Sequence, residues 1–154
     1  MIRVSKMIFV CVLCCLPIFA GSLNSVYAGD EATMEAVGGL TGAYVYQLYL
    51  NIGLVGDGVA KKCMEPEAGK QILGSVLRVA DVIDSQIDKM TKSNIADDDK
   101  KQLGEFRSVI ALLKTQGSEL EKFWETKEEE HGKKYETART SAWEKIKTLL
   151  GIKD

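Results

Sequence analysis

Residues 37–56 read VGGLTGAYVYQLYLNIGLVG, and this stretch decides the fold because it is long, uncharged and only weakly hydrophobic. Its length is sufficient for a helix that crosses a bilayer, which needs about 20 mostly apolar residues. Five glycines, three tyrosines, Gln47 and Asn51 lower its hydrophobicity, however, and Asp57 follows at once. Apolar residues recur at helical spacing at Leu40, Tyr44, Leu48, Ile52, Val55 and Val59. We therefore predict a buried helix of a bundle, with a membrane span and a partly unwound segment as the alternatives.

The glycines of this segment need an explanation, because each costs about 0.5–1 kcal/mol relative to alanine inside a helix. Six of them fall in the predicted helix: Gly38, Gly39, Gly42, Gly53, Gly56 and Gly58. One interpretation is close packing against a neighbouring helix at the 38/42 and 53/56 pairs. The other is a groove, left by the missing side chains, for a ligand or a partner.

The end of the first helix is marked by Pro66. A proline disfavours helix in the residue before it and suits the first turn of the next helix, where the neighbouring Glu67 is favourable at the helix N-terminus. Further on, the segment SNIADDD indicates a turn, in which one of the aspartates at 97–99 caps a third helix.

Later signals divide the remainder of the chain into two helices. Gly117 suits a helix C-terminus, and Ser118 with Glu121 has the capping-box spacing of a new N-terminus. Gly151 then ends the last helix. The four predicted helices span residues 31–63, 66–92, 98–115 and 118–150.

The second, third and fourth helices each carry an apolar stripe with steps of three and four residues. The stripes are Val76, Ala80, Ile83, Ile87 and Met90; then Leu103, Phe106, Ile110 and Leu113; then Leu120, Trp124, His131, Tyr135, Ala138, Ala142, Ile146 and Leu149. Such stripes indicate helices that share a core, and short connections favour antiparallel neighbours. We therefore predict an all-α, single-domain, up-and-down antiparallel four-helix bundle over residues 29–154.

Residues 1–28 have the layout of a secretory signal peptide. Arg3 and Lys6 make the start basic, the apolar run MIFVCVLCCLPIFAG follows, and Val26 and Ala28 precede a cleavage site after Ala28. The cysteines of the apolar run stand inside it rather than at the cut, which argues against a lipoprotein signal. We predict an exported bacterial protein, periplasmic or secreted.

Cleavage would leave 126 of the 154 residues, enough for one domain with one core. It removes two basic residues and no acidic one, so the net charge changes from −2 to −4. This mild acidity gives no electrostatic reason to bind nucleic acid or anionic lipid. The mature chain keeps Cys63 as its one cysteine, and three states are open to it: burial as a small apolar residue, an intermolecular disulfide in a homodimer, or a free thiol.

Motifs for catalysis, metal or haem are incomplete in this chain. Glu128 and His131 have the Glu-x-x-His spacing of di-iron bundles, but those sites use the motif twice and this chain has one histidine. No Cys-x-x-Cys-His motif is present for covalent haem. A nucleophilic Cys63 would need a nearby histidine, whereas His131 is expected in the middle of another helix. We predict no enzyme, no cofactor and no metal site, and keep a metal or haem bundle as the weakest alternative.

His131 lies on the predicted seam of the fourth helix, and antiparallel pairing with the first helix places it level with Tyr49 and Asn51. Asp84 of the second helix comes level with Gln47. The predicted mid-bundle polar layer therefore consists of Tyr44, Gln47, Asn51, Asp84 and His131. Buried polar groups commonly satisfy one another and fix helix register. Alternatively, this layer lines a small-molecule pocket.

Three functional hypotheses follow from the sequence. The first is a non-enzymatic exported binding module that contacts an unknown protein partner through the glycine-rich first helix and the aromatic fourth. The second is a small-ligand-binding bundle whose pocket is the layer around His131. The third is a metal or redox protein.

Overall fold

The computed structural model describes residues 31–153. These residues form four helices and no strand: α3 (Glu31–Ala60), α4 (Pro66–Thr91), α5 (Asp97–Thr126) and α6 (Glu129–Leu150). The predicted all-helical fold is therefore confirmed for this part of the chain. The predicted signal peptide and its cleavage site lie outside the described residues. Within 31–153, no helix combines the length and the hydrophobicity needed to span a bilayer.

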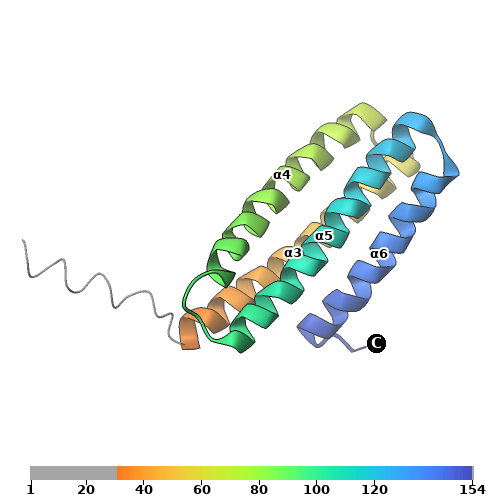
Figure 1. Ribbon diagram of the computed structural model, residues 1–154. Helices are drawn as coiled ribbons and strands as arrows, with labels where there is room; N and C mark the ends of the chain where they lie inside the picture. The colour runs from red at the N-terminus through yellow and green to blue at the C-terminus, as the bar shows by residue number, and fades with distance from the viewer. Residues whose placement is uncertain (1–30, 154) are drawn as a thin grey trace, which may run out of the picture.

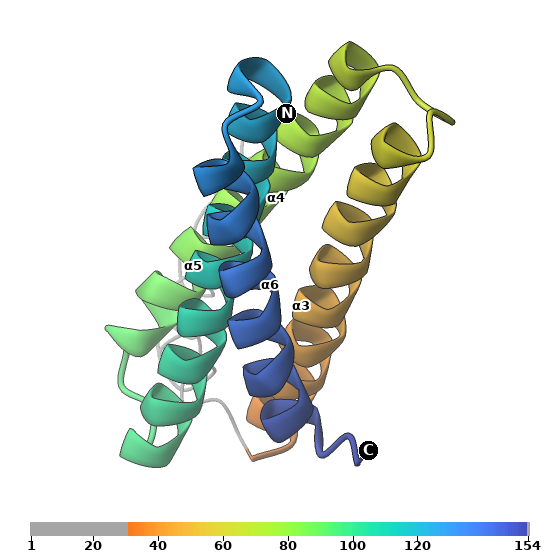
Figure 2. The same cartoon turned by 90° about the vertical axis from the view of Figure 1, so that its right-hand side faces the viewer.

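The four helices pack side by side, and the chain reverses direction at each connection (Figure 1, Figure 2). Both α3 and α5 contact the other three helices, whereas α4 and α6 do not contact each other. The helices α3 and α5 therefore meet across the middle of the described domain, with α4 on one side and α6 on the other. The most extensive contact joins α5 to α6.

The core runs along the length of the domain and draws on all four helices. Its buried apolar side chains include Val45, Leu48, Ile52, Leu73, Ala80, Ile87, Leu103, Phe106, Ile110, Leu113, Ala142 and Ile146. Full burial of a leucine, isoleucine or phenylalanine side chain stabilises a fold by about 1.5–3 kcal/mol. The small residues Ala138 and Ala142 are buried on α6, and small side chains at a helix contact permit a close approach.

The predicted stripe of α3 is wrong at its N-terminal end. Leu40 is 73% exposed, and Thr41 is buried in its place. The physical reason is rotation: a helix turns about 100° per residue, so steps of four from Leu40 through Tyr44 to Leu48 drift about 80° around the axis. The buried face that is centred on Val45 and Leu48 therefore leaves Leu40 on the solvent side.

The predicted boundary between the third and fourth helices is also wrong. The helix α5 continues from Asp97 through Gly117 and Ser118 to Thr126, and α6 begins only at Glu129. The Ser118 hydroxyl donates a hydrogen bond to the carbonyl of Thr115 inside the helix and caps nothing. The predicted third helix of 98–115 is therefore too short, and the predicted fourth helix of 118–150 begins too early.

Burial of one helix face explains why α5 continues past Gly117 and Ser118. Leu113, Gln116, Gly117, Leu120 and Trp124 continue one buried face across the expected break. A β-carbon at Gly117 would lie 2.8 Å from a methyl carbon of Leu77 in α4. Gly117 therefore allows close packing of α4 on α5 and does not end the helix. Tertiary packing outweighs the cost of one glycine, which is about 1 kcal/mol.

Other boundary signals are confirmed in part. Pro66 stands in the first turn of α4 with Glu67 beside it, and Gly151 ends α6 in the left-handed conformation at φ 64°. The aspartates at 97–99 lie inside the first turn of α5, whose N-cap is Ala96, and no side chain caps this helix. These aspartates therefore favour the helix through its dipole rather than by capping.

The glycines of α3 divide between the two interpretations. A β-carbon at Gly42 would lie 2.7 Å from a methyl carbon of Leu150, and one at Gly56 would lie 3.3 Å from Leu120. Close helix packing therefore explains these two positions. Gly39 and Gly53, by contrast, have open space where a β-carbon would be, so packing does not explain them.

We predict opposite effects of alanine at two other glycines. A β-carbon at Gly69 in α4 would lie 2.8 Å from Val59 and 3.2 Å from Trp124, whereas Gly104 in α5 has open space. Gly69→Ala should lower the free energy of unfolding by about 1–3 kcal/mol through overpacking. Gly104→Ala should raise it by about 0.5–1 kcal/mol through helix propensity. Urea denaturation followed by circular dichroism measures both, and a stabilising Gly69→Ala would contradict the close approach of α3, α4 and α5.

Candidate functional site

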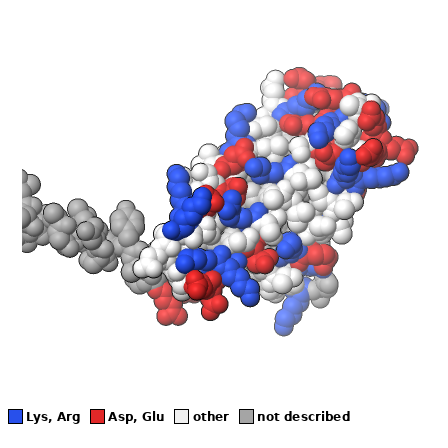
Figure 3. All heavy atoms as spheres, viewed as in Figure 1, with Lys and Arg blue, Asp and Glu red and all other residues white. Residues whose placement is uncertain are grey.

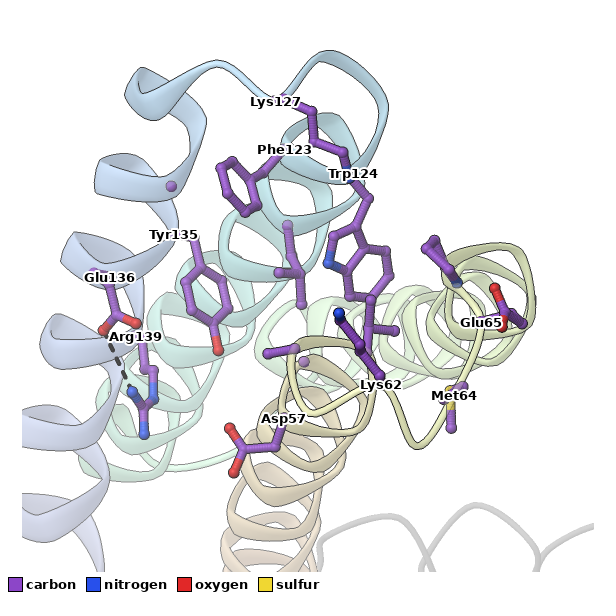
Figure 4. Close-up of a pocket in the computed structure, with 16 residues that line it drawn as sticks. Asp57, Lys62, Met64, Glu65, Phe123, Trp124, Lys127, Tyr135, Glu136 and Arg139 are labelled. Carbon is purple, nitrogen blue, oxygen red and sulfur yellow. Dashed lines mark hydrogen bonds and ion pairs between the residues drawn. The ribbon is translucent and has the colours of Figure 1, made fainter.

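A pocket of about 710 Å³ opens at the end of the domain where α3 and α5 end and α4 and α6 begin (Figure 4). We call it the end pocket. Its apolar wall consists of Val59, Met64, Leu120, Phe123, Trp124 and Tyr135. Three of these residues belong to the last two turns of α5, which place them together because positions three and four apart share a helix face.

Two glycines, one on α6 and one on α3, add open space to the pocket. Gly132 lines the pocket, and a β-carbon there would meet only the Phe123 ring, at 3.6 Å. Gly56 of α3 also lines it, and the Tyr135 hydroxyl lies 3.3 Å from where its β-carbon would be. The absent side chains thus admit Tyr135 towards α3 and leave the face of Phe123 free for another molecule.

A buried amide lies behind the wall. Gln116 is 0% exposed, and neither of its amide atoms has a hydrogen bond of ordinary geometry. Burial raises the pKa of Tyr135, and the Gln116 amide opposes this by lowering it. The Tyr135 phenol is therefore neutral near pH 7 and can donate a hydrogen bond at the wall of the pocket.

Charged side chains form the rim of the end pocket: Asp57, Lys62, Glu65, Lys127, Glu136 and Arg139. Arg139 lies 3.3 Å from Glu136, one turn earlier on α6. The Lys61 ammonium lies 2.9 Å from Asp57, and its hydrogen bond lowers the pKa of that carboxyl group. Lys62 and Lys127 make no ion pair with any described residue. The two lysines are therefore unpaired cations at the rim, whose three acidic and three basic residues balance in total and include the unpaired Glu65.

These same two lysines hold unusual backbone conformations. Lys62 has φ 57° and Lys127 has φ 61°, and they are the two non-glycine residues with positive φ in residues 31–153. Each follows the end of a helix, α3 or α5, where glycine is the usual residue and where Gly151 stands after α6. A left-handed conformation costs a residue with a side chain about 1–2 kcal/mol. Figure 4 shows both lysines beside Trp124, with Tyr135, Glu136 and Arg139 across the pocket.

A buried carboxylate fastens α6 to α5 next to the pocket. Glu119 accepts hydrogen bonds from Lys122, at 2.7 Å, and from Nδ1 of His131, also at 2.7 Å. Because a carboxylate only accepts, Nδ1 of His131 carries the proton. The Lys122 hydrogen bond first and the His131 bond second lower the pKa of Glu119 to about 2. The other ring nitrogen of His131 lies 3.5 Å from Glu128.

The predicted mid-bundle polar layer does not form. Gln47 is exposed and donates a 2.9 Å hydrogen bond to Asn51 one turn along the same helix. Asp84 instead pairs with Arg107 of α5, at 2.8 Å. The buried hydroxyl of Tyr44 has no hydrogen-bond partner among residues 31–153, and burial followed by the charge of Asp81 raises the pKa of this tyrosine. His131 lies in the first turn of α6, bound to Glu119.

The misplaced helix boundary explains this failure. The Trp143 ring of α6 stacks on Tyr49, with ring centroids 5.3 Å apart, and Tyr135 reaches Gly56. The antiparallel register therefore carries His131 beyond Asn51, to the level of the end of α3. His131 was expected in the middle of the fourth helix and instead lies in the first turn of α6.

Cys63 is exposed in the connection between α3 and α4, so the burial interpretation is wrong. Its sulfur lies 3.7 Å from the carbonyl oxygen of Lys61. Within 31–153, no three or more His, Cys, Asp or Glu side chains are grouped so as to hold a metal ion.

The residues of the end pocket were not identified from the sequence. Phe123 and Trp124 precede the charged segment ETKEEEHGKK, whose acidic and basic side chains crowd the upper end of the domain in Figure 3. Adjacent aromatics beside such a segment are the signal that points to a helix end with an apolar wall. The left-handed lysines have no comparable signal, because a lysine gives no indication of positive φ.

Comparison of the chain with protein-family models, with curated proteins and with solved structures finds no match. The geometry of the end pocket and the amino-acid sequence therefore carry the functional argument.

We predict that Glu119 contributes stability that acid removes. Its pKa falls from 4.5 to about 2 on folding, so its contribution is complete above pH 4.5 and is lost as the pH falls towards 2. Glu119→Gln should remove this part of the pH dependence of unfolding. Glu130→Gln is the matched control, since the exposed Glu130 forms its ion pair with Lys134, whose hydrogen bond is the main cause of its lowered pKa. Urea denaturation at a series of pH values measures both, and equal changes in the two variants would contradict a special role for Glu119.

We predict that glycine at Lys127 stabilises the fold. Lys127→Gly relieves a left-handed lysine and should raise the free energy of unfolding by about 1 kcal/mol. The measurement is best made near 0.5 M salt, where the attraction of the lysine charge to the helix dipole is screened. Lys133→Gly, at an exposed interior position of α6, should instead lower it by about 0.5–1 kcal/mol. A destabilising Lys127→Gly would show that its side chain stabilises the helix end.

Proposed function

We propose that this chain is a non-enzymatic binding module, an up-and-down antiparallel four-helix bundle whose ligand site is the end pocket. We further propose that the ligand is a small amphipathic molecule with an apolar body and a carboxylate. This proposal keeps the hypothesis of a ligand-binding bundle and moves its site from the middle of the helices to their end. A protein partner bound through the glycine-rich first helix and the aromatic fourth stays a separate proposal.

The observation that carries this proposal is the pairing of an aromatic wall with two unpaired lysines. A volume of about 710 Å³ is within the usual range for small-molecule sites, which are mostly apolar with a few placed polar groups. The wall of Phe123, Trp124 and Leu120 suits an alkyl or aromatic body. Lys62 and Lys127 supply charged hydrogen-bond donors for an anion, and the Tyr135 phenol supplies an uncharged hydrogen-bond donor.

The left-handed lysines support the same conclusion on energetic grounds. Glycine at either position would be less strained, so retaining a lysine there costs stability. Strained residues concentrate at binding sites, where the surrounding structure holds them. Binding of an anion by lysines at the rim of an apolar pocket would explain why strained lysines stand at these two positions.

Export is proposed from residues 1–28 alone. Their basic start, apolar run and small residues before Ala28 favour a cleaved signal peptide and a periplasmic or secreted location. A module that binds small amphipathic carboxylates outside the cytoplasm would act as a carrier or a sensor of such molecules rather than as an enzyme.

Titration with decanoate and with decanol tests the proposed ligand class. In a Trp143→Phe background, the fluorescence of Trp124 reports on the end pocket. We expect decanoate to bind more tightly than decanol. Gly132→Leu should weaken both ligands at least about tenfold by filling the pocket, and Gly104→Leu, at an open glycine outside the pocket, is its matched control.

The double variant Lys62→Gly with Lys127→Gly tests the anionic part. It keeps the backbone conformation while removing both charges, and should weaken decanoate by roughly 5- to 30-fold, the equivalent of about 1–2 kcal/mol for two exposed charge contacts. Binding of decanol should not change. Failure of wild-type protein to bind either molecule would refute the pocket, and equal binding of both would refute the anionic ligand.

A further inference from the structure

The outer face of α3 is apolar, exposed and free of charge over most of its length. We define the α3 outer face as Gly39, Leu40, Ala43, Gln47, Leu50 and Leu54. Leu40 is 73% exposed and Leu54 is 68% exposed, whereas Leu50 is half-buried. No charged residue occurs from 37 to 56. An exposed apolar face of this kind marks an interaction surface in a protein that is otherwise rich in surface charge.

The spacing along this face is that of a helix seam. Leu40, Ala43, Gln47, Leu50 and Leu54 follow steps of three, four, three and four residues. That repeat brings apolar residues to a single line along a helix that pairs with another helix. The core-facing side of α3 has its own buried residues, so this second line is not used inside the described domain.

We propose that the α3 outer face pairs with the same face of a second copy of this chain, with the two α3 helices antiparallel. Antiparallel pairing about Gln47 sets Ala43 against Leu50 of the second copy and Leu40 against Leu54. The small Ala43 then meets the large Leu50, and the two leucines Leu40 and Leu54 meet further out. Parallel pairing would set alanine on alanine and leave a gap, which close-packed interfaces avoid.

One polar residue interrupts the apolar line of the α3 outer face. At the centre, Gln47 would meet its own counterpart, where a single polar residue on a seam fixes register.

The small size of the surface indicates a weak, transient dimer. The 20 residues of 37–56 give a helix about 30 Å long and about 10 Å wide, or roughly 300 Å² on each copy, against about 800 Å² in a standard interface. This pairing is independent of the end pocket and of the thiol, because antiparallel α3 helices hold the two Cys63 residues at opposite ends.

Sedimentation equilibrium of the purified protein under reducing conditions tests the dimer. We expect a concentration-dependent dimer with a dissociation constant on the order of 10–100 µM. Leu54→Glu should weaken it at least about tenfold, while Ala111→Glu, which adds the same charge at an exposed position of α5, should leave it unchanged. Unaltered helicity by circular dichroism confirms that both variants fold.

Crosslinking tests the orientation in a Cys63→Ser background. Chains with Leu40→Cys are mixed with chains with Leu54→Cys and oxidised, and mass spectrometry then identifies each crosslinked pair. We expect mixed pairs, because antiparallel helices bring position 40 against position 54. Crosslinks of like with like would overturn the orientation. Three results would overturn the dimer itself. The protein could stay monomeric at all concentrations up to about 0.5 mM, or Ala111→Glu could weaken the dimer as much as Leu54→Glu does. The protein could also bind neutral lipid vesicles without self-association.

Discussion

Burial along one face of α5 is the constraint on which the rest of this domain depends. The face runs unbroken from Leu103 to Trp124 and gives α5 contacts with every other described helix. Because it continues through Gly117, the helix ends only at Thr126, and the start of α6 moves with it. The end pocket exists as a result, since Phe123 and Trp124 then lie at a helix end beside Tyr135.

Sequence periodicity was sufficient for the helical class and for most of the core, including Ala80, Ile87, Leu103, Phe106 and Ile146. It failed where a local signal conflicted with packing. The pair Gly117 and Ser118 resembles a helix boundary in the sequence. Only the packing of Leu77 from α4 shows that Gly117 is a helix contact. The sequence contains both the apolar stripe of α5 and the glycine signal for a helix end, but it does not indicate which of the two determines the structure.

The candidate site was less predictable than the fold because it depends on register and on backbone conformation. His131 was expected level with Tyr49 and Asn51, whereas the later start of α6 places it against Glu119. Lys62 and Lys127 were missed because positive φ at a lysine leaves no trace in the sequence. Such positions become visible only once the helix ends are placed in space.

An even number of antiparallel helices also brings the two limits of the domain together. The start of α3 and the end of α6 lie at the same end of the described domain (Figure 2). The residues that line the end pocket belong to the other end. The 30-residue length of α3 separates the two ends by about 45 Å. A molecule that enters the end pocket therefore approaches the described domain from the side remote from Glu31 and Leu150, and neither residue lines the pocket.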